Sequence, residues 1–129
     1  MTEPVWIDAG DALTLHALLL ARHGGAAGVR DDALLQSALA RPHQHYAYAE
    51  TPDIIDMATA YTAGIVGNHP FVDGNKRTGF VVGILFLELN GYRFTATEED
   101  AAQAILELAA GTLDEAAYTS FLRANTKAE

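Results

Sequence analysis

One short run of the sequence constrains the fold more than any other feature. The residues from Phe80 to Leu87, FVVGILFL, would make a helix that is apolar on every side, and such a helix is stable only when other elements surround it. We therefore expect it to be the central buried helix, beginning near Asn75, running to Asn90 and followed by Gly91 in the left-handed conformation. The run is far shorter than the ~20 apolar residues that cross a membrane, so no membrane span is expected.

Helical periodicity and capping residues extend over most of the remaining chain. Five other helices are expected. The first covers Asp8–His23, with Asp8 and Asp11 as a capping pair, and the second covers Asp32–Leu39, between a cap at Asp31 and a stop at Pro42. The third is opened by Thr51 and Pro52 and ends before His69, the next runs from Thr97 to Gly111, and the last is capped by Thr112 and Glu115. The segment His43–Glu50 predicts a short strand or flap, Trp6 is expected to anchor the first helix, and residues 125–129 are expected to be frayed. The whole pattern predicts an all-α protein.

Length and composition limit what the chain can be. Its 129 residues predict a single domain over residues 1–129, and the lack of cysteine excludes disulfides, thiolate metal sites and a cysteine nucleophile. The net charge of −9 argues against direct nucleic-acid binding, which needs a basic surface. The first residues, MTEPVWIDAG, lack the basic and apolar regions of a signal peptide, so we expect a cytoplasmic protein.

The residues that can carry chemistry gather in the string NHPFVDGNKRTG, from Asn68 to Gly79. Pro70 and Gly74 prevent a regular helix through this string. We therefore expect a loop that delivers its polar side chains to the N-terminus of the buried helix.

Two cations of this string, Lys76 and Arg77, fall in the first helical turn, where the helix dipole disfavours positive charge. A bound anion would remove the conflict, because the free N–H groups of a helix N-terminus form a phosphate site. Asp73 can hold Mg²⁺, which proteins usually bind through one or two carboxylates together with substrate phosphates. His69 is suited to act as a general base near neutral pH. This combination predicts phosphoryl transfer, whereas a purely structural loop would leave the cation pair unexplained.

The string HPFVDGNKR resembles the signature of the Fic/Doc (Fido) superfamily, His-Pro-Phe-x-(Asp/Glu)-Gly-Asn-(Gly/Lys)-Arg. The segments GGAAGVRDDALLQSALARP and FLELNGY are similar to the death-on-curing (Doc) branch, and the resemblance extends from about Trp6 to Arg123. It implies a compact six-helix Fic fold, a single Fido domain with its core at about residues 6–123. It also implies that ATP and Mg²⁺ take part, with roles for the following motif residues: His69 as the catalytic base toward a target hydroxyl, Asp73 as the metal ligand, and Gly74, Asn75, Lys76 and Arg77 as the nucleotide and phosphate site.

Two departures from the adenylylating members of the superfamily bear on the activity. Those members have glycine at the position of Lys76 and a second arginine at the position of Phe80. The resemblance therefore favours a Doc-like protein kinase, the toxin of a type II toxin–antitoxin system, which transfers the ATP γ-phosphate to a hydroxyl of elongation factor Tu and arrests growth. A protein adenylyl- or other nucleotidyltransferase and an inactive Fic-fold binding module remain the alternatives.

The partner implied by the resemblance is a separate antitoxin protein. Self-inhibiting members carry a helix with the pattern (Ser/Thr)-x-x-x-Glu-(Gly/Asn). Thr95 and Glu99 match the spacing, but Asp100 follows them, so the pattern is absent.

The remaining histidines and tyrosines are assigned mainly to structure. His16, on the apolar face of the first helix, is interpreted as a packing histidine rather than a ligand. His43 and His45 have no third ligand nearby in the sequence, so no metal site is expected there. Tyr46 and Tyr48 fit either packing or, by resemblance, a flap that docks a target segment by strand addition.

Overall fold

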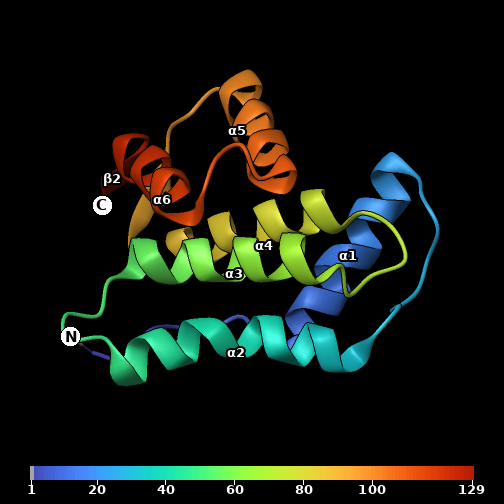
Figure 1. Cartoon of the computed structure of the whole chain (residues 1–129), viewed down its shortest axis with the longest axis horizontal. Helices are drawn as coiled ribbons and strands as arrows, with labels where there is room; N and C mark the ends of the chain where they lie inside the picture. The colour runs from blue at the N-terminus through green and yellow to red at the C-terminus, as the bar shows by residue number, and fades with distance from the viewer. Residues whose placement is uncertain (1) are drawn as a thin grey trace.

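A computed structural model describes residues 2–129 and contains six helices and a two-stranded sheet in the order α1 (Ala9–His23), α2 (Asp32–Tyr48), α3 (Ile54–Asn68), α4 (Asn75–Leu89), β1 (Tyr92–Phe94), α5 (Glu98–Ala110), α6 (Glu115–Ala124) and β2 (Thr126–Ala128). The expected all-α architecture is confirmed. Helices α2, α3 and α4 lie along one another, α1 crosses one end, and α5 and α6 cover the side of α3 away from α2 (Figure 1). No helix of the described residues is both long and apolar enough to span a membrane.

The central helix is α3, not α4 as the apolar run predicted. Every α3 residue from Ile54 to Val66 except Asp56 is buried, whereas α4 buries one face and leaves Phe80 and Ile84 on its other side half-exposed. Small residues explain the difference, because α3 is rich in alanine, threonine and glycine and lets its neighbours approach. A Cβ added at Gly64 would lie 3.1 Å from Ala38 of α2, so only a small residue fits there.

Helix α2 continues through Pro42 to Tyr48, so the predicted stop and the predicted strand or flap at His43–Glu50 are wrong. Pro42 is itself buried, on the same face as Leu35, Ala38 and Leu39. Burial of this face against α3 outweighs the lost hydrogen bond of an interior proline, which by itself destabilises a helix by about 3 kcal/mol. The extended segment beside the motif loop lies elsewhere, where Val29 forms an isolated antiparallel bridge with Phe71.

Most expected helix ends are confirmed, including the Asp8–Asp11 capping box, the caps at Asp31 and Thr97, and the left-handed Gly91 and Gly111. Two caps were misplaced. Helix α3 is capped by Asp53, not Thr51, and α6 by Asp114, not Thr112, because these carboxylates accept the free N–H groups of each first turn.

The C-terminal residues are not frayed as expected. Thr126–Ala128 pairs antiparallel with Tyr92–Phe94, and the Glu129 N–H donates to the Gly91 carbonyl at 2.8 Å. The short sheet fastens the end of α6 to the end of α4.

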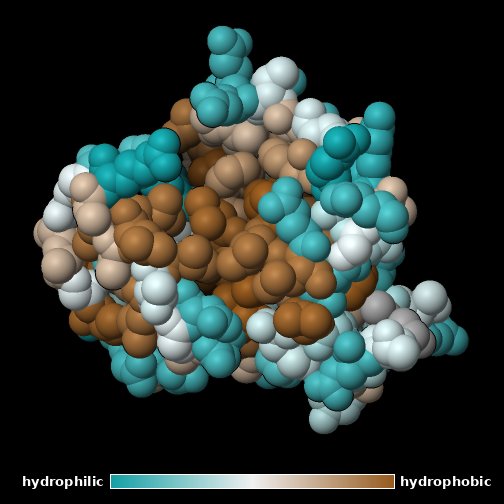
Figure 2. All heavy atoms as spheres, turned by 180° about the vertical axis from the view of Figure 1, so that it is seen from behind, coloured by the Kyte–Doolittle hydropathy of each residue, from teal (hydrophilic) through white to brown (hydrophobic). Residues whose placement is uncertain are grey.

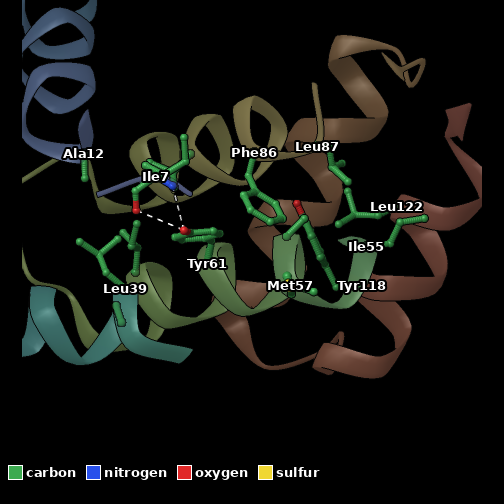
Figure 3. Packing of buried hydrophobic residues seen from close by; sticks show 14 of the residues in the cluster. Ile7, Ala12, Leu39, Ile55, Met57, Tyr61, Phe86, Leu87, Tyr118 and Leu122 are labelled. Atoms are coloured by element: carbon green, nitrogen blue, oxygen red, sulfur yellow. Dashed lines mark hydrogen bonds between the residues drawn. The ribbon is translucent and has the colours of Figure 1, made fainter. Parts of the chain in front are cut away.

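The core is fastened to the N-terminal segment through Tyr61 of α3 (Figure 3). The Ile7 N–H donates to the Tyr61 hydroxyl at 2.9 Å, and the hydroxyl donates to the Ile7 carbonyl at 3.1 Å. Burial raises the pKa of Tyr61 to about 12, since the ionised form would lose its hydration. Beside this pair, Trp6 stacks on His43 with ring centroids 3.8 Å apart and also contacts Phe86, so it joins the segment before α1 to α2 and α4.

Candidate functional site

The motif residues lie in the tight loop between α3 and α4. Helix α3 ends at Asn68, and His69 follows in the left-handed conformation (φ 51°, ψ 55°), the only non-glycine residue among residues 2–129 with positive φ. Such a backbone costs about 1 kcal/mol or more for a residue with a side chain. Its persistence means that the surrounding contacts impose it. At the other end of the loop, Gly74 is also left-handed and directly precedes the first turn of α4.

Asn75 holds the loop together from inside. Its side chain is 6% exposed, its Oδ1 accepts the Phe71 N–H at 2.9 Å, and its Nδ2 donates to the Phe71 carbonyl at 3.0 Å. The same Nδ2 lies 3.4 Å from Nδ1 of His69. Asn75 therefore links the first turn of α4 to the His69 ring, and its amide is engaged with the loop itself.

His16 supports the opposite end of the loop. It is buried, stacks on Phe71 with ring centroids 3.9 Å apart, and its Nε2 donates to the Asp73 carbonyl at 2.8 Å. The packing interpretation is confirmed, and the hydrogen bond adds a contact that the sequence did not indicate. It fixes the backbone of the residue that carries the expected metal ligand.

Arg30 also holds this loop in place, a role that the sequence did not indicate. Its Nε donates to the His69 carbonyl at 2.7 Å and its Nη2 to the Asn68 carbonyl at 2.9 Å. Its backbone N–H donates to the Pro70 carbonyl at 2.7 Å. One residue therefore holds three consecutive carbonyls around His69. The available signal was weak: Arg30 is one of eight Lys and Arg residues and lies after the glycine-rich segment.

Asp73 is exposed at the mouth of the loop. Its Oδ1 accepts the Gly74 N–H at 2.8 Å, and its Oδ2 accepts the Ala26 N–H at 3.3 Å. Within residues 2–129, no group of three His, Cys, Asp or Glu side chains is placed to hold a metal ion. A single exposed carboxylate fits Mg²⁺ that arrives with a phosphate-bearing substrate, since such ions keep most of their ligands from water and phosphate.

Lys76 and Arg77 are exposed in the first turn of α4. Within residues 2–129, no side chain caps this helix and neither cation forms an ion pair. The two cations therefore do lie at the positive end of the helix dipole, as the sequence indicated. Both residues line a cavity of about 500 Å³ between α4, β1 and α5, whose walls include Phe80, Ile84 and Ile105. Figure 2 shows the face opposite to that in Figure 1, with a hollowed apolar patch in its middle and hydrophilic side chains around it.

His69 opens on a different cavity. A space of about 440 Å³ lies between the C-terminal end of α3, the end of α5 and the start of α6, and His69 lines it together with Val66, Leu108 and Leu113. The expected base and the expected phosphate-binding cations thus belong to one loop but border separate spaces.

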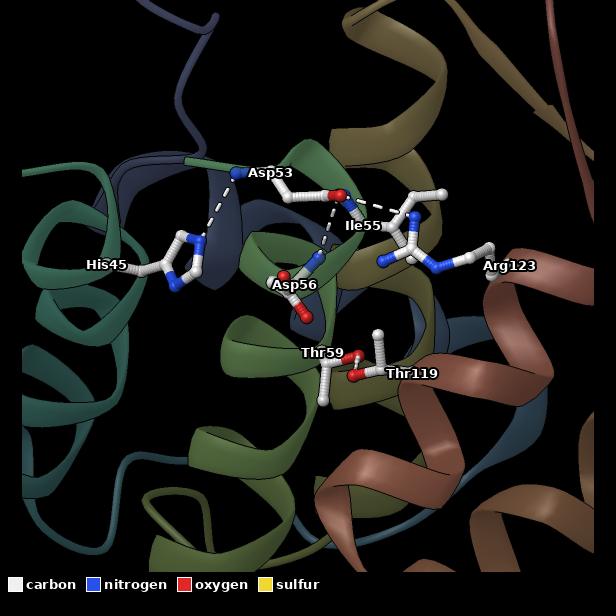
Figure 4. Close-up of polar contacts among 7 residues, drawn as sticks. All are labelled: His45, Asp53, Ile55, Asp56, Thr59, Thr119 and Arg123. Atoms are coloured by element: carbon white, nitrogen blue, oxygen red, sulfur yellow. Dashed lines mark hydrogen bonds and ion pairs between the residues drawn. The ribbon is translucent and has the colours of Figure 1, made fainter. Parts of the chain in front are cut away.

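The other histidines and tyrosines lie away from this loop. The Asp53 N–H donates to Nε2 of His45 at 3.2 Å, and the Asp53 carboxylate pairs with Arg123 at 3.2 Å (Figure 4). Tyr46 packs against the core, whereas Tyr48 is 86% exposed at the end of α2. Since this segment is helical, the docking strand considered for Tyr46 and Tyr48 is absent from it.

Comparison with known proteins identifies the family. A model of the Fic/DOC family matches residues 6–87, which contain α1 to α3, the motif loop and most of α4. The chain belongs to the Fic/DOC family. It is 38% identical over 97 residues to the protein named Toxin Doc of Mycolicibacterium smegmatis, covering 74% of this chain and 71% of that protein. It is 31% identical over 85 residues to Protein kinase doc of Escherichia phage P1, covering 66% of this chain and 68% of that protein. The Doc resemblance read from the motif is confirmed.

Proposed function

We propose that this Fic/DOC chain is a Doc-like toxin of a type II toxin–antitoxin system and acts as a protein kinase. Its substrates would be ATP and a hydroxyl of a translation factor, elongation factor Tu. Phosphorylation of that factor would arrest growth. The names of two relatives, Toxin Doc and Protein kinase doc, support the proposal of a toxin with kinase activity. The partner that silences it would be a separate antitoxin protein.

The observation that carries the kinase proposal is the first turn of α4. Lys76 and Arg77 stand there without ion-pair partners among the described residues, beside the free N–H groups of the helix. This arrangement favours a bound phosphate group. Lys76 occupies the position where adenylylating members of the superfamily have glycine, so its side chain takes the space that their α-phosphate uses.

In the proposed reaction, His69 accepts the proton of the acceptor hydroxyl. The hydroxyl oxygen attacks the γ-phosphorus, the bond from that phosphorus to the bridging oxygen breaks, and ADP leaves. Lys76 and Arg77 stabilise the charge on the transferring group. Asp73 would hold Mg²⁺, which neutralises phosphate charge when bound. Gly74 and Asn75 shape the turn on which these side chains stand, through the left-handed cap and the Phe71 hydrogen bonds.

The decisive experiment follows a label from ATP to protein. Purified chain is incubated with elongation factor Tu, Mg²⁺ and ATP labelled at either the γ or the α phosphorus. We expect protein-bound label from the γ position only. Label from the α position would instead establish a nucleotidyltransferase, and transfer from neither, together with no growth arrest, would favour a binding module.

A further inference from the structure

We infer that the cavity beside His69 holds the segment of the target protein that presents the acceptor hydroxyl. This inference rests on the proposed kinase function and concerns the second substrate of the same site. The cavity, of about 440 Å³, lies where the end of α3 meets the turn between α5 and α6.

The first argument is the separation of the motif residues. Among them, His69 lines this cavity, whereas Lys76 and Arg77 line the larger cavity along α4. Transfer between two substrates needs the base to face the acceptor hydroxyl and the cations to face the phosphates. The nucleotide therefore belongs on the side of Lys76 and Arg77. The acceptor segment would lie in the cavity beside His69 and extend its hydroxyl across the loop to the γ-phosphate, because attack needs the two atoms in contact.

The second argument is the shape of the cavity. A Cβ added at Gly67, two residues before His69, would meet no atom within 4 Å, so the space above the last turn of α3 is open to another chain. The walls formed by Ala63, Val66 and Leu113 are small or aliphatic. They suit a serine or threonine with small apolar neighbours.

The third argument is charge. The rim carries Asp114 and Glu115, and no lysine or arginine lines the cavity. Glu115 is paired with Arg41 of α2, and Asp114 uses Oδ1 to cap α6, where it accepts the Ala117 N–H at 2.8 Å. The structure gives Asp114 Oδ2 no partner among the described residues. The acceptor segment should therefore carry a lysine or arginine close to its hydroxyl residue.

The experiment fills the cavity without touching the motif. Ala109 lines it and is exposed near the end of α5, whereas the neighbouring Ala110 is also exposed and does not line it. Ala109→Trp is compared with the matched control Ala110→Trp. A third variant, Asp114→Asn, removes the charge but keeps the cap, because asparagine caps helices as well as aspartate. Two quantities are measured: growth arrest on induction in a bacterial host, which needs the acceptor whatever its identity, and the Kd for ATP by calorimetry, which does not.

We expect Ala109→Trp to abolish growth arrest while its Kd for ATP stays within about twofold of wild type, a change of roughly 0.4 kcal/mol. Asp114→Asn should weaken arrest with unchanged ATP binding, and Ala110→Trp should behave as wild type. Thermal melting followed by circular dichroism identifies a variant that fails to fold, in which case Asp114→Asn decides.

Three results would overturn the inference. Full arrest by both Ala109→Trp and Asp114→Asn would show that the acceptor docks elsewhere. A parallel loss of ATP affinity would assign the cavity to the nucleotide. A wild-type chain that neither binds ATP nor arrests growth would refute the proposed function itself, and the acceptor site with it.

Discussion

The side chain of Arg30 offers a direct test of how the loop between α3 and α4 is held. It donates to the carbonyls of Asn68 and His69, and its loss in Arg30→Met leaves the backbone bond from Arg30 to Pro70 in place. The substitution therefore isolates the contribution of the guanidinium. Methionine preserves the aliphatic stem, so little packing is lost.

The expected magnitude follows from these contacts. A hydrogen bond from a charged donor contributes about 1.5–3 kcal/mol when well shielded. Arg30 is exposed, and water competes for both carbonyls, so we expect about 1–2 kcal/mol for the two bonds together. If that energy keeps His69 in its left-handed position, its loss lowers kcat about 5- to 30-fold. The KM for ATP should change little, because Arg30 does not line the cavity of Lys76 and Arg77.

The assay has two parts. Steady-state transfer of γ-label at saturating ATP gives kcat and KM, with Arg93→Met as the control, since Arg93 is an exposed arginine of β1 far along the chain from the loop. Hydrogen exchange of the Val72 amide, which donates to the Gly28 carbonyl at 3.0 Å, reports loop opening independently of activity. We expect faster exchange at Val72 and unchanged exchange in α3. Wild-type kcat together with wild-type exchange in Arg30→Met would refute the reasoning.

Three further predictions follow from the same loop and from the packing of α4. His69→Ala should abolish toxicity and leave the melting temperature within a few degrees of wild type, because the side chain is exposed; retained toxicity would exclude His69 as the base. Lys76→Gly should lower γ-phosphoryl transfer at saturating ATP by at least about tenfold, roughly 1.4 kcal/mol, and weaken ATP binding without abolishing it, since Arg77 remains; an unchanged rate would contradict the kinase assignment. Gly83→Ala should destabilise the protein by about 1–3 kcal/mol in a denaturant titration, because the new Cβ would overlap Thr62 Oγ1 and lie 3.1 Å from the Ala58 carbonyl. Wild-type stability in that variant would mean that α3 and α4 can separate without penalty.

The gathering of the motif residues at one helix N-terminus could be predicted from the sequence, because it depends only on residues that are neighbours in the chain. Pro70 and Gly74 interrupt helices wherever they occur, and the next residues must then begin α4. The residues from His69 to Arg77 therefore had to lie together at one helix N-terminus, as they do. The contacts that His16 and Arg30 make with the loop could not be predicted in this way. His16 and Arg30 reach it from 57 and 39 residues away in the chain, and no periodicity records such contacts.

Helix ends likewise include some that local sequence determines and others that only packing decides. Caps such as Asp8, Asp31, Thr97 and Gly111 act on backbone groups within a few residues, so the sequence by itself determined them. Tertiary structure alone decided that α2 continues through Pro42, that β2 pairs with β1, and that α3 rather than α4 occupies the centre. Strand β2 forms through backbone pairing with the distant strand β1. In the two helical cases, burial against neighbouring helices outweighs a local preference of a few kcal/mol. That balance exists only once the helices are packed together.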